Sequence, residues 1–225
     1  KSPMYALQNV FMNARKFDLP AEEIKEMLPE VVNDLNYTTA LIENLLHWAK
    51  TQMQSSSIEP EQINLTQLAT DTIRQLHLQA EEKSQTVELL IHEPLFAWAD
   101  ANMISLVIRN LVSNAIKFSP KGGHIVVGTV ASGNTAGLFV QDSGTGIDAM
   151  TFDKIQSNQV YSTPGTQNEK GTGLGLTLCK EFLGRNGGSL TIESSTRKGS
   201  KFSFRLPATS NRNFAHKEYA AANNY

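Results

Sequence analysis

Apolar residues spaced alternately by four and three positions indicate helices in the first part of the chain. This spacing defines a heptad seam, which is narrower than the apolar stripe of an ordinary surface helix. An earlier, shorter segment keeps the same rhythm, and Pro20 separates the two because proline disfavours helical backbone in the residue before it. The shorter segment shows the pattern at Leu7, Val10, Ala14 and Phe17, and the longer seam consists of Ile24, Leu28, Val31, Leu35, Thr38, Ile42, Leu45 and Ala49.

Two heptad helices joined by a short turn predict a helical hairpin within residues 1–57. A single hairpin would leave its seam in contact with water. We therefore expect two chains to pair into a dimeric four-helix bundle, with packing of the hairpin on the following domain as the alternative.

Beyond residue 57 the pattern changes to short alternating runs and amphipathic stretches, which predict a second domain over residues 58–208. Because strands and helices do not alternate regularly, we expect an α+β fold in which helices pack on a mixed sheet. The tail over 209–225 is polar and irregular. Helices are expected at 66–83, 101–118 and 176–185, and strands at 63–65, 87–91, 96–98, 124–130, 136–141, 189–194 and 201–206.

The composition sets further limits. The chain has 225 residues, is 40% hydrophobic and carries a formal net charge of -2, so nothing favours nucleic acid or an anionic membrane as a partner. Its single cysteine, Cys179, cannot form an intramolecular disulfide. A lone cysteine is most often a small buried hydrophobic residue, and we expect this of Cys179. No apolar run is long enough to cross a bilayer, so we expect a cytoplasmic piece without membrane contact, whose parent protein can still be anchored elsewhere.

Polar residues occupy one side of the predicted helix 101–118. Asn110, Asn114 and Lys117 follow one another at intervals of four and three, so they share a face that the apolar residues do not use. Asparagine is unfavourable inside a helix because its amide competes for backbone hydrogen bonds, and the trio therefore suggests a shared polar ligand. An amide oxygen suits Mg²⁺ and a lysine suits phosphate, whereas a solvated helix face is the alternative.

Two glycine-containing blocks follow this helix. Asp142 ends a strand beside Gly144 and Gly146, where its carboxylate can accept the exocyclic N–H of adenine, although such a block alone is also a common turn. The block at 171–176 opens a helix, whose free amides and dipole favour a phosphate chain. The polar loop 157–170 before it suggests a mobile nucleotide lid.

In this order the blocks resemble the N, G1, F and G2 boxes of sensor histidine kinases. Residues 110–118 match Asn-x-x-x-Asn-Ala-x-Lys-Phe, 142–147 match Asp-x-Gly-x-Gly-Ile and 171–176 match Gly-x-Gly-Leu-Gly-Leu. The F box is the loosest match, with Phe152 in place and Ile155 where a second aromatic residue is expected.

This resemblance implies a nucleotide-binding α/β sandwich after a dimerisation and histidine-phosphotransfer hairpin. It implies ATP and Mg²⁺ as cofactors, and a second copy of the chain and a response-regulator receiver domain as partners. By the family pattern Asn114 would bind Mg²⁺, Asp142 would bind adenine, and Asn110 and Lys117 would be catalytic. The binding residues that it implies are Asn110, Asn114, Lys117, Phe118, Asp142, Gly144, Gly146, Ile147, Lys170, Gly171, Thr172, Gly173, Leu174, Gly175 and Leu176.

The implied function is a bacterial protein-histidine kinase of two-component signalling. ATP hydrolases of the same fold place a glutamate four residues before the metal-binding asparagine, as general base for the attacking water. Here that position is Asn110, whose amide cannot take the proton, so the residues favour a kinase over a hydrolase. A nucleotide-binding dimerisation scaffold without catalysis is the second alternative.

The phosphoacceptor motif of the family reads His-Asp/Glu-x-Lys/Arg-Ser/Thr-Pro. Lys1-Ser2-Pro3 resembles its last three residues, so we expect the histidine just upstream of Lys1 and no self-phosphorylation by residues 1–225 alone. None of the histidines present has the motif around it: His47, His77, His92, His124 and His216.

Overall fold

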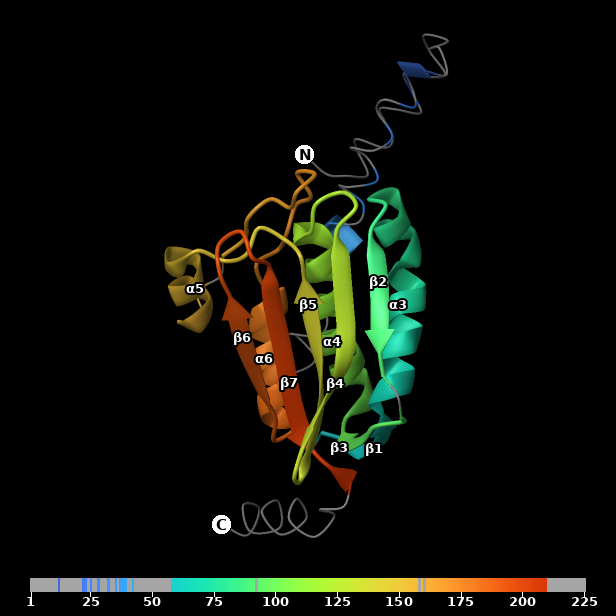
Figure 1. The fold of residues 1–225 in the computed structure, drawn as a ribbon, viewed down its shortest axis with the longest axis vertical. Helices are drawn as coiled ribbons and strands as arrows, with labels where there is room; N and C mark the ends of the chain where they lie inside the picture. Colours follow the sequence, from blue (N-terminus) through green and yellow to red (C-terminus); the bar gives the residue numbers. More distant parts are fainter. Residues whose placement is uncertain are drawn as a thin grey trace.

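A computed structural model of the chain describes residues 58–91, 93–157, 159 and 161–209, together with isolated positions between residues 12 and 42. The hairpin predicted for 1–57 and the tail predicted for 209–225 lie almost entirely outside the described residues, and the bounds of the three predicted segments stay predictions. The elements of the described part (Figure 1) are β1 (Glu61–Asn64), α3 (Leu65–Glu82), β2 (Thr86–Leu90), β3 (Phe96–Ala99), α4 (Ala101–Phe118), β4 (His124–Ser132), β5 (Thr135–Asp142), α5 (Ala149–Gln156), α6 (Gly175–Arg185), β6 (Ser189–Ser194) and β7 (Ser200–Pro207).

Side-chain caps explain where three of the helices begin. Asn64, Asp100 and Asp148 each accept a hydrogen bond of 2.9–3.1 Å from a backbone N–H two or three residues further on. These bonds satisfy amides that a helix leaves free at its start. The cap at Asn64 also corrects the expectation that Leu65 continues the first strand, because β1 ends at Asn64 and Leu65 is the first residue of α3.

The large sheet has the strand order β2-β4-β5-β7-β6. β2 pairs with β4 in parallel, whereas the other three neighbouring pairs are antiparallel, so the predicted mixed sheet is confirmed. Ser132 pairs with Thr135, and Gly133 and Asn134 therefore form the tight hairpin loop between β4 and β5. β1 and β3 form a separate antiparallel pair.

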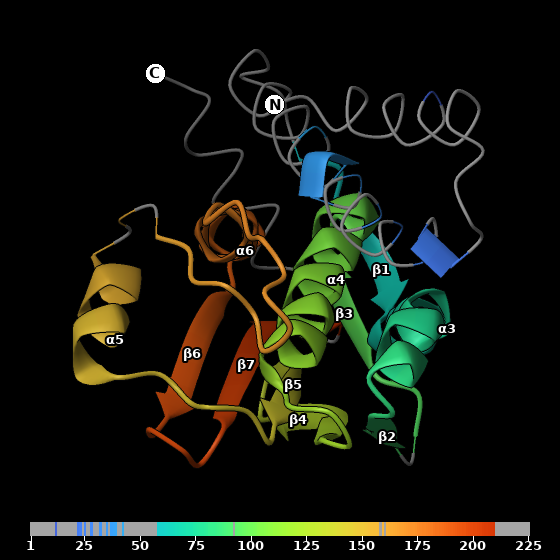
Figure 2. The same cartoon turned by 90° about the horizontal axis from the view of Figure 1, so that it is seen from above.

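Three helices, α3, α4 and α6, cover one face of this sheet (Figure 2). α5 stands at the edge of the domain beside β6 in both views, and none of its residues is buried. The sequence pattern did not predict α5, which has only eight residues and no fully buried position. Within the part of the chain that the structure describes, no helix is long and apolar enough to cross a membrane.

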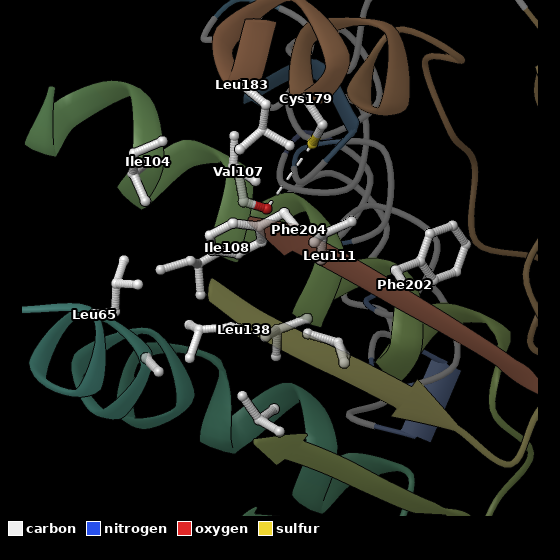
Figure 3. Close-up of a cluster of buried hydrophobic side chains, with 14 of the residues drawn as sticks. Leu65, Ile104, Val107, Ile108, Leu111, Leu138, Cys179, Leu183, Phe202 and Phe204 are labelled. Atoms are coloured by element: carbon white, nitrogen blue, oxygen red, sulfur yellow. Dashed lines mark hydrogen bonds between the residues drawn. The ribbon is translucent and has the colours of Figure 1, made fainter. Parts of the chain in front are cut away.

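The apolar face of α4 lies at the centre of the core. Burial raises the pKa of the Cys179 thiol to about 12, and its sulfur lies 3.9 Å from the carbonyl oxygen of Val107 on α4, which confirms that this cysteine is buried. The core thus occupies one side of α4 and leaves the opposite side for polar residues. Labelled in Figure 3 are Leu65, Ile104, Val107, Ile108, Leu111, Leu138, Cys179, Leu183, Phe202 and Phe204, which come from α3, α4, the sheet and α6.

Candidate functional site

The polar face of α4 opens into a cavity of about 580 Å³. Asn110, Asn114 and Lys117 all line this cavity, and all three are partly exposed while the apolar face of the same helix is buried. The side chains that the sequence singled out therefore line a common cavity.

Most of the other residues implied by the family pattern reach the same cavity from the end of α4, from the loop after β5 and from the segment that leads into α6. Two of the implied residues are not part of its lining. Gly144 is buried next to Asp142, and Leu174 is the N-cap residue of α6. The lining includes Phe118, Asp142, Gly146, Ile147, Lys170, Gly171, Thr172, Gly173, Gly175 and Leu176.

Asp142, at the end of β5, has a carboxylate that is held by the backbone. Its Oδ1 accepts hydrogen bonds from the amides of Gly144 at 2.8 Å and Ser200 at 3.2 Å. Burial raises the pKa of this carboxyl, and the two hydrogen bonds offset that shift only in part. No described residue donates to Oδ2, so this second oxygen is available to a ligand.

The ammonium group of Lys117 lies against the loop that precedes α6. Its Nζ donates to the carbonyl oxygen of Thr163 at 3.0 Å and lies 4.7 Å from the centre of the Phe118 ring. Burial lowers the pKa of Lys117, the charge of Glu169 raises it and the charge of Lys83 lowers it again, with a net lowering. An ammonium group has three hydrogens, so Lys117 retains donors for phosphate oxygens beside its bond to Thr163.

The glycine block at the start of α6 packs directly on the polar face of α4. A Cβ atom on Gly171 would collide with Nζ of Lys117, and one on Gly175 would lie 2.9 Å from Oδ1 of Asn110. No side chain among the described residues caps the N-terminus of α6, and its first turn has no acidic residue. The amides and the positive dipole end of α6 are therefore available to an anion beside Lys117.

The loop predicted to be a nucleotide lid is attached to the C-terminal end of α4. The amide of Thr166 donates to the carbonyl of Lys117 at 3.1 Å, and its hydroxyl donates to the carbonyl of Ser119 at 2.7 Å. In Figure 2 this connection, drawn in orange, passes beside α4 on its way to α6. The mobility of the lid stays a prediction, but its middle has a defined anchor.

The lid reaches the cavity through residues other than the phenylalanine of the F box. Phe152 does not line the cavity in the described part of the chain, whereas Ile155 and Tyr161 do. Tyr161 is thus the aromatic residue of the lid that lines the cavity, and its ring centre lies 4.2 Å from Nζ of Lys154.

Two residues of this region escaped the sequence analysis. Lys83, which follows α3, is 3% exposed and forms an ion pair of 2.9 Å with Glu169 of the lid. A lysine after a helix and a glutamate in a polar loop are normally solvated, so neither position differs in the sequence from an ordinary surface charge. Their importance follows from a contact between the lid and the end of α3, which no sequence pattern indicates.

Comparison with known proteins relates this geometry to a family. The model for histidine kinase-, DNA gyrase B- and HSP90-like ATPases matches residues 99–210. The chain is 32% identical over 213 residues to hybrid signal transduction histidine kinase D of Dictyostelium discoideum, and 30% identical over 195 residues to adaptive-response sensory kinase SasA of Thermosynechococcus vestitus. These alignments cover 91% and 85% of this chain but only 13% and 51% of the two relatives, so the chain spans about half of their length or less.

Solved structures agree with this relationship. The catalytic domain of histidine kinase ThkA matches with a TM-score of 0.59 at 27% identity, over 67% of this chain and 97% of that domain. ThkA in complex with the response regulator protein TrrA has the same fold, with a TM-score of 0.68 at 21% identity over 93% of this chain and 59% of that one. Residues 99–210 therefore belong to the histidine kinase-, DNA gyrase B- and HSP90-like ATPase family, and the α+β domain has the fold of the catalytic domain of histidine kinase ThkA.

Proposed function

We propose that this chain is the core of a protein-histidine kinase that binds Mg²⁺·ATP and transfers the γ-phosphate to a histidine, from which it passes to an aspartate of a response-regulator receiver domain. The family and the named relatives support this activity. The observation that carries the proposal is the shared cavity of Asp142, Asn114 and Lys117. These three side chains supply an acceptor for adenine, an oxygen ligand for Mg²⁺ and a cation for phosphate.

Adenine is proposed to bind at Asp142. The backbone amides of Gly144 and Ser200 hold Oδ1, so Oδ2 is the oxygen that accepts the exocyclic N–H of the base. Phe118 and Ile147 line the same cavity and can contact the faces of the ring. Burial of this carboxylate strengthens the hydrogen bond because the local dielectric constant is low.

The triphosphate is proposed to bind between α4 and the start of α6. Among the described residues no cluster of three or more His, Cys, Asp or Glu side chains could hold a metal ion. Mg²⁺ is commonly held by few protein oxygens together with phosphates, and Oδ1 of Asn114 is such an oxygen, with Asn110 next to it on the helix. When bound, Mg²⁺ would neutralise charge on the phosphates. Lys117 and the free amides of α6 would hold their other oxygens.

Phosphoryl transfer to histidine requires little proton chemistry from the protein. A ring nitrogen of the imidazole forms a bond to the γ-phosphorus, the bond from this phosphorus to the bridging oxygen breaks, and ADP leaves with the electron pair. Because the nucleophile is already reactive, positioning and charge stabilisation suffice. Asn110 lies four residues before Asn114, where a hydrolase would carry its glutamate base, so we propose transfer rather than hydrolysis.

Incubation with γ-labelled ATP tests this function. The parent protein should acquire phosphate that is stable in alkali and labile in acid, as a phosphoramidate is, and should pass it to a receiver domain. Residues 1–225 alone should bind ATP without labelling, because none of their histidines lies in the expected motif. Rapid ATP hydrolysis without labelling would favour the hydrolase, and binding without either reaction would favour the scaffold.

We propose that two copies of the chain pair through the heptad seam. Leu28 and Ile42 belong to this seam, have helical backbone and are 40% and 52% exposed in the single chain, as expected for a surface that a second copy covers. The solved complex of ThkA with TrrA supports a receiver domain as the second partner.

A further inference from the structure

The ammonium group of Lys83 lies under the C-terminal end of α4. Its Nζ is within hydrogen-bond distance of four oxygens, namely the carbonyls of Ile116 and Lys117 at 2.8 and 3.0 Å, the hydroxyl of Thr166 at 2.7 Å and Oε1 of Glu169 at 2.9 Å. The first two belong to the helix that carries the binding residues, and the last two belong to the lid. Lys83 therefore joins α3, α4 and the lid at one point.

A positive charge is favourable at this position. The last carbonyls of a helix have no partner within the helix and carry the negative end of its dipole, so an ammonium group there stabilises α4. The same group pairs with the carboxylate of Glu169, which is 26% exposed and also accepts a hydrogen bond of 2.7 Å from the amide of Gln167.

Glu169 interacts electrostatically with a second lysine. Its charge also acts on Lys117, the residue proposed to bind phosphate. In the structure, however, Glu169 forms its ion pair with Lys83, while Nζ of Lys117 donates to the carbonyl of Thr163. Gly165 keeps Lys117 close to this carboxylate, because a Cβ atom there would lie 2.6 Å from Cγ of Lys117 and collide with a carboxylate oxygen of Glu169.

We propose that Lys83 is a positioning residue that holds Glu169, so that Lys117 stays free to bind the phosphates of ATP. The inference rests on the proposed function of Lys117. Without Lys83, the carboxylate of Glu169 would turn to Lys117, and an ion pair between these two side chains would compete directly with the nucleotide.

A purely structural role for Lys83 gives a different result. If Lys83 only caps α4, its removal would disturb the whole cavity, and ligands with and without phosphates would lose affinity together. The two roles are separated by comparing Mg²⁺·ATP with adenosine, and by removing the charge of Glu169 in the same protein.

The experiment is calorimetric titration of Mg²⁺·ATP and of adenosine into the wild-type chain, K83M, E169Q and K83M/E169Q. K83M should weaken the affinity for ATP by about tenfold to hundredfold, the range expected when a hydrogen bond to a charged group is lost. Its affinity for adenosine should stay within about twofold of the wild-type value. K83M/E169Q should recover most of the ATP affinity, and E169Q alone should stay close to wild type. Lys121→Met, at an exposed lysine of the turn after α4, is the matched control and should change neither affinity.

Thermal melting establishes whether K83M is folded. K83Q is the second variant: its amide can still donate to the carbonyls of α4 but carries no charge, so it should show the same selective loss of ATP affinity. Equal losses for both ligands, or no recovery in the double variant, would overturn the role assigned to Lys83. A wild-type chain that binds no ATP would instead overturn the proposed function.

Discussion

Gly144 and Asp142 form the short hydrogen bond that orients the proposed adenine site: the amide of Gly144 donates to Oδ1 of Asp142 over 2.8 Å. Gly144 in turn packs against the backbone of Phe118, at the end of α4, so closely that a Cβ atom would collide with its carbonyl oxygen. These contacts therefore fix the position of the Asp142 carboxylate relative to α4, the helix that bears the proposed metal and phosphate ligands.

Asp142→Asn should reverse the preference of the site for adenine. The two backbone amides would hold the oxygen of the substituted side chain, and its NH₂ group would face the exocyclic amine of the base, donor against donor. We expect ATP to bind about tenfold to hundredfold more weakly. Inosine triphosphate has a carbonyl at that position and should lose little affinity. Competition titrations with the two nucleotides measure this, and parallel losses would contradict the assignment of Asp142.

The affinity for ATP should also fall in acid. Only the ionised carboxylate of Asp142 is a pure acceptor, and burial raises its pKa above the usual value, so protonation begins at a higher pH than for an exposed aspartate. Titrations over a series of acidic pH values should show the loss in the wild-type chain and a flatter profile in Asp142→Asn.

The affinity for ATP should fall again in alkali, for the opposite reason. Burial lowers the pKa of Lys117, with the charge of Glu169 as a smaller opposing influence, so its positive charge disappears at a lower pH than that of an exposed lysine. ATP binding should weaken as the pH rises through this lowered pKa, while adenosine binding stays constant. Lys117→Arg keeps its charge throughout this range and should remove the alkaline decline if the variant binds ATP.

Asn114→Ala should weaken Mg²⁺·ATP more than adenosine. The variant removes the oxygen proposed to bind the metal, but it leaves Asp142 unchanged. Calorimetry with both ligands, with and without Mg²⁺, checks the expectation. Asn114 is not a metal ligand if the two ligands lose affinity equally.

The heptad seam should hold two chains together. Ile42→Glu places a charge without a partner in the proposed interface, at a cost of several kcal/mol, and should yield monomers. Light scattering over a range of concentrations reports the molecular mass, and Asn33→Glu, off the seam on the same predicted helix, should leave the dimer intact. A wild-type chain that remains monomeric at high concentration would refute the seam.

The core should be sensitive to truncation at the sheet. Leu138 on β5 is fully buried, so Leu138→Ala should lower the free energy of unfolding by about 2–5 kcal/mol. Leu78→Ala removes the same atoms from a side chain that is 71% exposed, and should change the free energy of unfolding by less than about 0.5 kcal/mol. Urea denaturation of both variants gives the comparison.

The sequence predicted the elements whose apolar pattern is strong. α4 has the bounds predicted for it, because its buried positions recur at helical spacing and Asp100 caps its start. α5 was missed because it is short and has no fully buried residue, and Lys83 was missed because its importance depends on a contact with Glu169, 86 positions further along the chain. Motifs indicated residues that the structure brings to one cavity, whereas the network that holds them is visible only in three dimensions.

One helix, α4, presents Leu111 to the core and Asn110, Asn114 and Lys117 to the cavity. A ligand that binds to the polar face of α4 therefore also stabilises the core that packs on its apolar face. Nucleotide should raise the melting temperature of the domain by an amount that grows with the logarithm of its concentration, which makes thermal denaturation a direct measure of occupancy. Because α4 serves both the core and the cavity, substitutions deep in the core should also change the affinity for nucleotide whenever they shift the position of α4.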